Sequence, residues 1–266
     1  MDGKELRMRR ISKKKRFLIV PMDHGVSVGA VKGIENMDKI VQKVSRWSSA
    51  VLVHKGIAKN LKPKAIKNSG LIVHLSASTN LSPDANYKVL VGKVEDGIRL
   101  GADALSIHVN VGGSNGEPEM LKDLSFLAFE CFKFGMPLLA MMYARGKNVK
   151  DSLNPELVSH VARIGAELGA DIVKCNYTGS AETFKEVTKK CPVPVVIAGG
   201  PKVSNNRELL EMVYGSMEAH GCGISIGRNI FQHENPTLIT KVLSKIIFKK
   251  WSVEEAMEVL NEKNIF

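Results

Sequence analysis

The sequence predicts a single (β/α)8 barrel, an α/β fold in which eight parallel strands alternate with helices, over residues 1–266. The chain has 266 residues, and such barrels take about 250 residues in one domain. Eight short apolar runs rich in Val, Ile and Leu recur along it, as expected for strands buried on both faces of a parallel sheet. Stretches with helical spacing separate the runs and leave no room for a second domain.

The predicted elements follow one another evenly. Strands are expected at 17–23, 50–55, 70–76, 104–109, 137–143, 171–176, 194–200 and 223–228, and helices at 89–100, 155–168 and 181–189, among others. Asn154 before Pro155 is a typical helix start, and Gly-Ala-Asp at 101–103 and 169–171 ends two helices. An open doubly wound sheet is the rival fold, but the segment after the first run lacks the GxGxxG motif of dinucleotide-binding sheets.

The two ends of the chain extend this pattern. Residues 1–16 are expected to form a basic extension, and 251–266 an amphipathic helix that closes the barrel wall. The net charge is +11, with its densest positive cluster at 7–16. Positive clusters attract nucleic acids, but only 6% of residues are aromatic and no nucleic-acid module is recognisable. We therefore predict a solvated basic face and no nucleic-acid partner.

Two further function classes are disfavoured. No apolar run approaches the roughly 20 residues of a membrane span, and the first run ends at Asp23 without a cleavage motif. We expect no membrane association and a cytoplasmic location. The four cysteines form no CxxC pair, so reduced thiols are expected. Cys175, beside Lys174, is a possible nucleophile, but a small buried apolar role is favoured.

Polar side chains gather where the runs end, which is where barrel enzymes carry their chemistry. They are Asp23, His24, His54, Lys55, His74, Ser76, His108, Asn110, Tyr143, Arg145, Lys174 and Asn176. The last two runs end instead in Gly199-Gly200 and Gly227-Arg228. Bare backbone N–H groups after strands seven and eight, with a forked arginine, predict a phosphate site. Tight turns alone would also explain the glycines.

Lys174 is the candidate nucleophile. It lies within the apolar run 171–176, and desolvation in a barrel interior favours the neutral amine that attacks a carbonyl. The opposite strand face would instead send it outward to pair with a carboxylate. Lys55 is a rival nucleophile at the end of its own run. Tyr143 and Asp23 are candidates for proton transfer in a Schiff-base reaction.

Histidines ending the first four runs suggest an alternative. His24, His54, His74 and His108 are the residue type that binds zinc from several strands. A metal-dependent aldolase or hydrolase is therefore the second hypothesis, although carboxylates other than Asp23 are scarce there and Lys174 would stay unexplained. We expect neither a metal nor a cofactor.

The motifs together resemble the archaeal-type class I aldolases, which include DeoC-like and fructose-bisphosphate aldolases. The motifs are VPMDHGVS at 20–27, MMYARG at 141–146, DIVK at 171–174 with YTG at 177–179, AGGP at 198–201 and GRNIFQ at 227–232. The resemblance implies that Lys174 forms the Schiff base, Tyr143 donates a proton and Asp23 accepts one. It also implies that Gly199, Gly200, Gly227 and Arg228 hold a sugar phosphate, that His24, Gly25, Val26, Ser27, Ala144 and Arg145 contact substrate, and that barrels assemble into a homo-oligomeric ring.

The resemblance further implies small-molecule substrates, a sugar phosphate and an aldehyde. It is strongest to members that transfer a fragment of 6-deoxy-5-ketofructose 1-phosphate to L-aspartate semialdehyde on an alternative route to aromatic amino acids. Ala144, and a stretch 27–31 without proline, depart from many relatives. Two sister activities therefore stay open: fructose-bisphosphate cleavage, and condensation of aspartate semialdehyde with dihydroxyacetone phosphate. A non-catalytic phosphate-binding barrel is the non-enzyme alternative.

Overall fold

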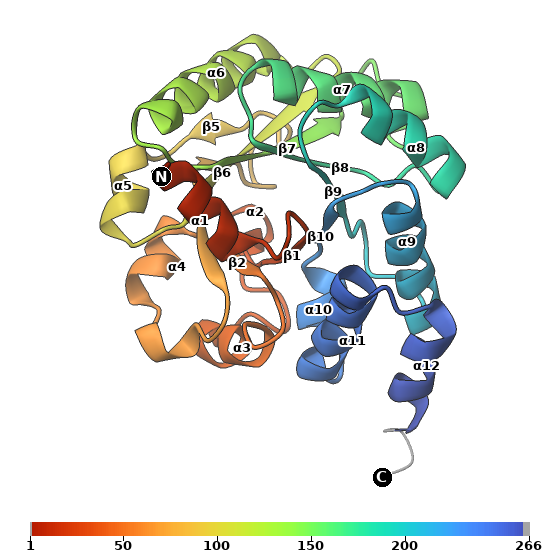
Figure 1. Ribbon diagram of the computed structural model, residues 1–266. Coiled ribbons are helices and arrows are strands. Elements are labelled where there is room, and N and C mark those ends of the chain that lie inside the picture. Colours follow the sequence, from red (N-terminus) through yellow and green to blue (C-terminus); the bar gives the residue numbers. More distant parts are fainter. Residues whose placement is uncertain (1, 263–266) are drawn as a thin grey trace.

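The computed structural model describes residues 2–262 and shows a closed barrel of eight parallel strands (Figure 1). The strands are β1 (Phe17–Pro21), β2 (Ala50–His54), β3 (Gly70–His74), β6 (Ala104–Val111), β7 (Leu138–Ala144), β8 (Ile172–Cys175), β9 (Val195–Ala198) and β10 (Gly223–Ser225). They follow one another around the barrel in chain order, and β10 closes it against β1. The predicted TIM barrel is confirmed, and every predicted apolar run coincides with one of its strands, although β6 and β7 continue past their predicted ends to Val111 and Ala144.

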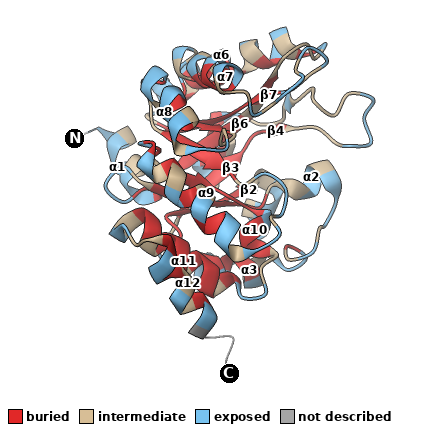
Figure 2. Ribbon diagram, turned by 90° about the vertical axis from the view of Figure 1, so that its right-hand side faces the viewer, coloured by how far each residue is buried: buried red, intermediate tan, exposed pale blue. Residues whose placement is uncertain are grey.

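Strand alternation separates two hydrophobic layers. Side chains of one parity fill the barrel interior, among them Ile19, Leu52, Leu139, Met141 and Ile172. Their neighbours of the other parity pack outward against the helices. Figure 2 shows the strands and the inner sides of the helices as buried, with the exposed residues outside. A residue's position along a strand therefore decides whether it reaches the interior.

Helices surround the strands as the sequence predicts. They are α3 (Met37–Val44), α4 (Lys55–Asn60), α5 (Val94–Arg99), α6 (Glu117–Lys133), α7 (Pro155–Glu167), α8 (Ala181–Lys190), α9 (Asn206–Glu218) and α11 (Pro236–Lys249), with short α2 (His24–Val28), α10 (Arg228–Phe231) and η1 (Pro63–Ala65). No helix within residues 2–262 is long and apolar enough to cross a membrane.

The helix predicted at 89–100 is corrected at its beginning. Val89–Leu90 form β5, which pairs antiparallel with β4 (Ser76–Ala77), and the helix starts only at Val94. Val91 N–H donates to Leu75 O over 2.7 Å. This pairing with a distant segment overrides the helical spacing of the sequence, because a local pattern carries no information about a strand partner.

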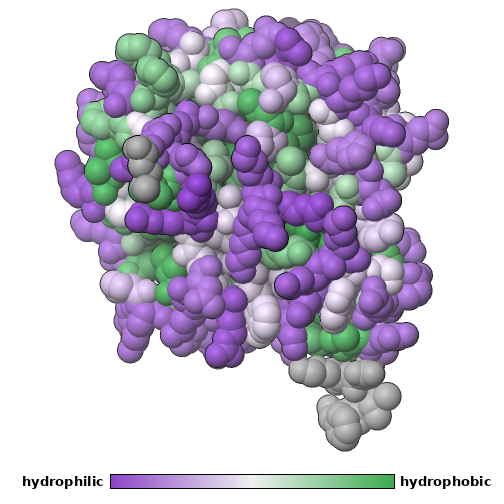
Figure 3. All heavy atoms as spheres, in the orientation of Figure 1, coloured by the Kyte–Doolittle hydropathy of each residue, from purple (hydrophilic) through white to green (hydrophobic). Residues whose placement is uncertain are grey.

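The basic extension is not merely a solvated face. Helix α1 (Gly3–Ile11) lies across the N-terminal end of the barrel, at the opposite end from α2 (Figure 2). Ile11 is fully buried in the interior cluster. The Lys4 ammonium lies 2.6 Å from the Asp171 carboxylate, and the Arg10 guanidinium 3.2 Å from that of Asp103. Hydrophilic side chains predominate on this face, with hydrophobic patches between them (Figure 3).

The C-terminal helix is present, but its packing differs from the expectation. Helix α12 (Val253–Glu262) packs chiefly against α9 and α11, while α11 is the helix that packs on β1. It therefore adds a second layer outside the barrel wall. The last four residues of the predicted helix, 263–266, lie outside the described residues.

Candidate active site

One cavity at the C-terminal ends of the strands brings the predicted catalytic residues together. This cavity, here called the mouth, has a volume of about 620 Å³. Lys174 from β8, Tyr143 from β7 and Asp23 after β1 all line it. The mouth thus combines an amine, a phenol and a carboxylate, the groups that Schiff-base chemistry needs.

Lys174 faces the interior of the barrel. It shares strand parity with Ile172, whereas Val173 and Cys175 pack outward. The residue is only 6% exposed, and no carboxylate oxygen within residues 2–262 lies within 4.0 Å of its ammonium nitrogen. The alternative of an outward, paired lysine is therefore excluded. A buried amine that opens only to a cavity is placed to attack a bound carbonyl.

The two rival nucleophiles are used elsewhere. Lys55 begins α4, where its ammonium group donates to Val91 O and lies 3.6 Å from the Asp96 carboxylate. Cys175 is fully buried among the apolar side chains of the outer layer, and burial raises the pKa of its thiol. Neither group lines the mouth.

Tyr143 is held in a fixed orientation by its neighbours. Its ring packs edge-on against His108 at 5.0 Å between centroids, and the Arg145 guanidinium lies 4.2 Å above the ring. His108 in turn is hydrogen-bonded through Nε2 to the Asn110 side chain at 2.9 Å. Because the ring is packed on two sides, the hydroxyl group has one position relative to the mouth.

Asp23 is surrounded by imidazoles. Its carboxylate oxygens lie 3.8 Å from His24 Nδ1 and 3.9 Å from His74 Nε2. Burial alone would raise the pKa of Asp23, but the attraction of His74, His24 and Lys174 outweighs it and holds this pKa well below its usual range. Burial lowers the pKa of His74 to about 4, with the Asp23 carboxylate opposing this. At neutral pH Asp23 is therefore ionised, so its oxygens can accept a proton, although the lowered pKa makes this carboxylate a weak base.

Buried His74 should make the stability of the protein depend on pH. Since its folded-state pKa of about 4 lies below the usual 6.5, the unfolded chain binds the proton more readily, and stability is lost as the pH falls from 6.5 to 4. Between pH 6.5 and pH 4 we expect the free energy of unfolding to fall by about 3 kcal/mol less in His74→Gln than in the parent protein. Denaturant unfolding at several pH values measures this. The control is His160→Gln at an exposed site of α7. If stability depended on pH equally in His74→Gln and in the parent, the predicted role of His74 would be wrong.

The histidines do not assemble as ligands. Within residues 2–262 no three His, Cys, Asp or Glu side chains are grouped so that they could hold a metal ion. His74 Nδ1 is hydrogen-bonded to Ser106 Oγ at 2.7 Å, and Nε2 is 3.3 Å from Ser76 Oγ. His54 packs edge-on against His74 at 5.0 Å between ring centroids. The donor geometry gives the zinc hypothesis no support.

The predicted phosphate loops lie side by side at the mouth, which Gly199, Gly200, Gly227 and Arg228 all line. The Arg228 side chain donates to Gly200 O over 2.8 Å. A Cβ at Gly227 would lie 2.5 Å from Pro21 O, and Gly200 has a φ of +60°. Steric requirements alone thus account for these two glycines, and phosphate binding stays a prediction.

Asn229, which sequence reasoning missed, holds these loops together. Its side chain donates to Gly199 O over 2.9 Å and to Pro201 O over 3.1 Å, and accepts from Val203 N over 2.9 Å. The residue is 4% exposed. A buried side chain with three backbone partners cannot be removed without leaving some of them unpaired.

Asn229→Ala should therefore weaken binding of a substrate whose phosphate lies at these loops, such as dihydroxyacetone phosphate. We expect the unpaired loop to cost about 2 kcal/mol of stability and to raise the KM about 10-fold. Steady-state kinetics and thermal unfolding test both effects. The N-cap variant Asn36→Ala, which removes a hydrogen bond to Lys39 N, should lose stability without the change in KM. An unchanged KM in Asn229→Ala would show that the loop does not hold the substrate.

Not every predicted substrate contact reaches the mouth. His24, Ser27 and Arg145 line it, but Gly25, Val26 and Ala144 do not. Val26 is 43% exposed on α2, and Ala144 packs outward. Alternation along β7 explains Ala144, because its neighbour Tyr143 faces inward. The mouth also contains residues that were not proposed as substrate contacts, among them Val28, Val31, Asn80, Asn86, Lys88, Asn176, Lys202, Ser225 and Gln232.

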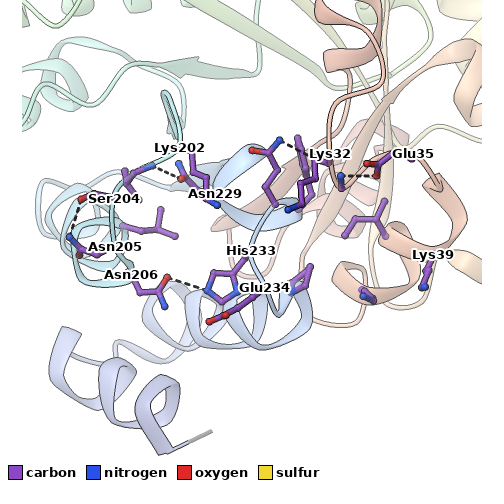
Figure 4. A pocket seen from close by; sticks show the side chains of 18 of the residues that line it. Lys32, Glu35, Lys39, Lys202, Ser204, Asn205, Asn206, Asn229, His233 and Glu234 are labelled. Atoms are coloured by element: carbon purple, nitrogen blue, oxygen red, sulfur yellow. Dashed lines mark hydrogen bonds between the residues drawn. The ribbon is translucent and has the colours of Figure 1, made fainter. Parts of the chain in front are cut away.

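A larger hollow of about 750 Å³ lies outside the barrel, between the segments 32–43 and 202–209 (Figure 4). Lys202 and Gln232 border both this groove and the mouth. The groove contains none of Lys174, Tyr143 and Asp23. The catalytic constellation therefore belongs to the mouth, although the outer groove is the larger space.

Comparison with known proteins decides the family. The family model described as DeoC/LacD family aldolase matches residues 17–233. The chain belongs to this aldolase family. The match covers the whole barrel from β1 to the residues just after α10. It confirms the resemblance inferred from the motifs, and the protein is an enzyme of the aldolase class.

Individual relatives agree with this assignment. The chain is 45% identical to 2-amino-3,7-dideoxy-D-threo-hept-6-ulosonate synthase 1 of Archaeoglobus fulgidus, over 97% of this chain and 96% of that protein. It is 40% identical to 2-amino-4,5-dihydroxy-6-oxo-7-(phosphonooxy)heptanoate synthase of Streptomyces griseus, over 87% and 85%. A solved Schiff-base-forming fructose-1,6-bisphosphate aldolase superposes with a TM-score of 0.84 at 30% identity, over 93% and 100%.

Proposed function

We propose that the enzyme transfers a three-carbon keto fragment from 6-deoxy-5-ketofructose 1-phosphate to L-aspartate semialdehyde through a Schiff base on Lys174. This is the activity of a 2-amino-3,7-dideoxy-D-threo-hept-6-ulosonate synthase. The observation that carries the chemistry is the buried Lys174 amine, which has no carboxylate partner among residues 2–262 and shares one cavity with Tyr143 and Asp23. The identity of 45% over nearly the whole chain supports the substrates.

The reaction balances with the groups at the mouth. The Lys174 amine adds to the C5 ketone, and loss of water leaves an imine. Cleavage of the C3–C4 bond sends its electron pair into the enamine, while the C3 hydroxyl proton passes to Asp23 and the phosphorylated aldehyde leaves. The enamine then attacks the aldehyde carbon of aspartate semialdehyde. Tyr143 supplies the proton to the new hydroxyl and is reprotonated with the proton that Asp23 accepted, and water releases the seven-carbon product from Lys174.

Mass spectrometry after borohydride reduction tests this proposal. The protein is incubated with 6-deoxy-5-ketofructose 1-phosphate, fructose 1,6-bisphosphate or dihydroxyacetone phosphate, each with and without a chelator. We expect a chelator-insensitive adduct on Lys174 with the first compound, and formation of the heptulosonate when aspartate semialdehyde is added. Absence of any adduct, with activity lost to the chelator, would overturn the imine mechanism.

A second candidate reaction follows from the phosphate loops beside Lys174. The product named for the Streptomyces griseus relative carries a phosphate next to its keto carbon, whereas a 7-deoxy product has none there. Gly199, Gly200 and Arg228 offer donors for such a group. Preferential trapping of dihydroxyacetone phosphate would favour its condensation with aspartate semialdehyde. Cleavage of fructose 1,6-bisphosphate would instead favour a fructose-bisphosphate aldolase. The ring-shaped homo-oligomer and the cytoplasmic location stay predictions.

A further inference from the structure

The β4–β5 pair carries a lysine into the mouth that no motif had indicated. Lys88 directly precedes β5, and its ammonium group donates to Ser78 Oγ beside β4. The Asn110 side chain donates to Asn86 O over 2.7 Å, which fixes the same segment against β6. Lys88 is half-buried and lines the mouth together with Arg145. Its position is therefore held by the fold and is not that of a free surface lysine.

Lys88 and Arg145 are cations that make no salt bridge in the described part of the chain. Within residues 2–262 no carboxylate oxygen lies within 4.0 Å of either side chain. Burial lowers the pKa of Lys88, and the neighbouring Arg145 lowers it further, while the more distant Asp23 and Asp84 carboxylates oppose this shift only in part. Lys88 is half-buried and Arg145 is exposed. Two like charges at one cavity repel each other, and an anion bound by both relieves this repulsion. The pair therefore has the character of an anion site.

This site lies on the other side of Lys174 from the phosphate loops. Around the barrel β8 stands between β9 and β7. Gly199, Gly200 and Lys202 follow β9, and Arg228 follows β10, whereas Arg145 follows β7 and Lys88 lies beside β6. A substrate bound to Lys174 through its carbonyl thus has cationic groups on both sides. An aldehyde that reacts at Lys174 from the β7 side would place its far end at Lys88.

We infer that Lys88, together with Arg145, binds the carboxylate of the acceptor aldehyde and so selects aspartate semialdehyde over uncharged aldehydes. This inference rests on the proposed function and adds a specificity residue to it. Lys88 and Arg145 bind the carboxylate end through charge-assisted hydrogen bonds, while the aldehyde end reaches the enamine on Lys174. Before cleavage, the phosphate of the bound 6-deoxy-5-ketofructose 1-phosphate occupies the same side, because it belongs to the fragment that leaves.

The test compares acceptors in Lys88→Met. With 6-deoxy-5-ketofructose 1-phosphate as donor, kcat/KM is measured for L-aspartate semialdehyde, for butanal, which has four carbons and no charge, and for glyceraldehyde 3-phosphate. The ratio for aspartate semialdehyde over butanal cancels any change in the amount of enamine. We expect this ratio to fall about 10- to 100-fold, as for the loss of one charge-assisted hydrogen bond, and Lys88→Arg to restore most of it. Lys64→Met, at an exposed site of η1, should leave it unchanged.

The outcomes separate this inference from the proposed function. An unchanged ratio in Lys88→Met, in a protein whose parent uses aspartate semialdehyde, would overturn the role of Lys88 alone. A selective loss with glyceraldehyde 3-phosphate would show that the site takes a phosphate acceptor and would overturn the carboxylate assignment. A parent enzyme that forms the Lys174 adduct but does not accept aspartate semialdehyde would overturn both the proposed acceptor and this inference.

Discussion

Lys174→Met should abolish turnover while leaving the barrel folded. Without the amine no imine forms, and we expect a loss of about 10^5-fold or more, as when a covalent nucleophile is removed from other enzymes. Borohydride should then trap no substrate on the protein. Because Lys174 is 6% exposed and makes no salt bridge within the described residues, an apolar side chain of similar length should keep or raise the thermal stability.

The matched control for this variant is Lys55→Met. Lys55 has its own partners, Val91 O and the Asp96 carboxylate, outside the mouth. This variant should still form the adduct on Lys174 and turn over substrate. Retained turnover in Lys174→Met, or an adduct on Lys55 in the parent protein, would contradict the assignment of the nucleophile.

Tyr143→Phe should slow the reaction after the imine has formed. The ring contacts with His108 and Arg145 do not involve the hydroxyl group, so the phenylalanine ring should pack in the same place. Loss of the proton-transferring hydroxyl should lower kcat about 10²- to 10⁴-fold. Because Lys174 is untouched, the trapped adduct should accumulate. Rapid quench with borohydride, followed by mass spectrometry, measures its fraction over time.

Tyr214→Phe on α9 provides the comparison, since Tyr214 is 36% exposed and does not line the mouth. Its kcat should match that of the parent. If the kcat of Tyr143→Phe lay within a factor of about two of the parent value, another group would have to act as the general acid–base. Asp23 would then be the first candidate.

Much of the site could be predicted because strand alternation is a local property. Once 171–176 is recognised as a strand, Ile172 and Lys174 must share one face and Val173 and Cys175 the other. The same rule places Tyr143 inward and, applied one residue further, places Ala144 outward. Parallel strands also bring their C-terminal ends to one rim, so Asp23, Tyr143 and Lys174 converge although they lie far apart in the sequence.

The residues that escaped prediction depend on distant partners. Lys88 lies ahead of a stretch with helical spacing, and only the pairing of β5 with β4 turns it toward the mouth. Asn229 follows Arg228 in the sequence like any helix residue, yet its partners are on the loop after β9. Likewise, the basic side chains of α1 form an apparently solvated cluster in the sequence, and only the fold brings Asp103 and Asp171 next to them.

The sequence by itself therefore determined the eight strands, the parity of their side chains and the polar residues at their ends, because backbone geometry ties these features to spacing along the chain. Only the tertiary structure decided which polar ends share a cavity, that Lys174 is unpaired while Lys55 is not, and that Lys88 joins Arg145. These are contacts between segments brought together by barrel closure, and no local periodicity encodes them.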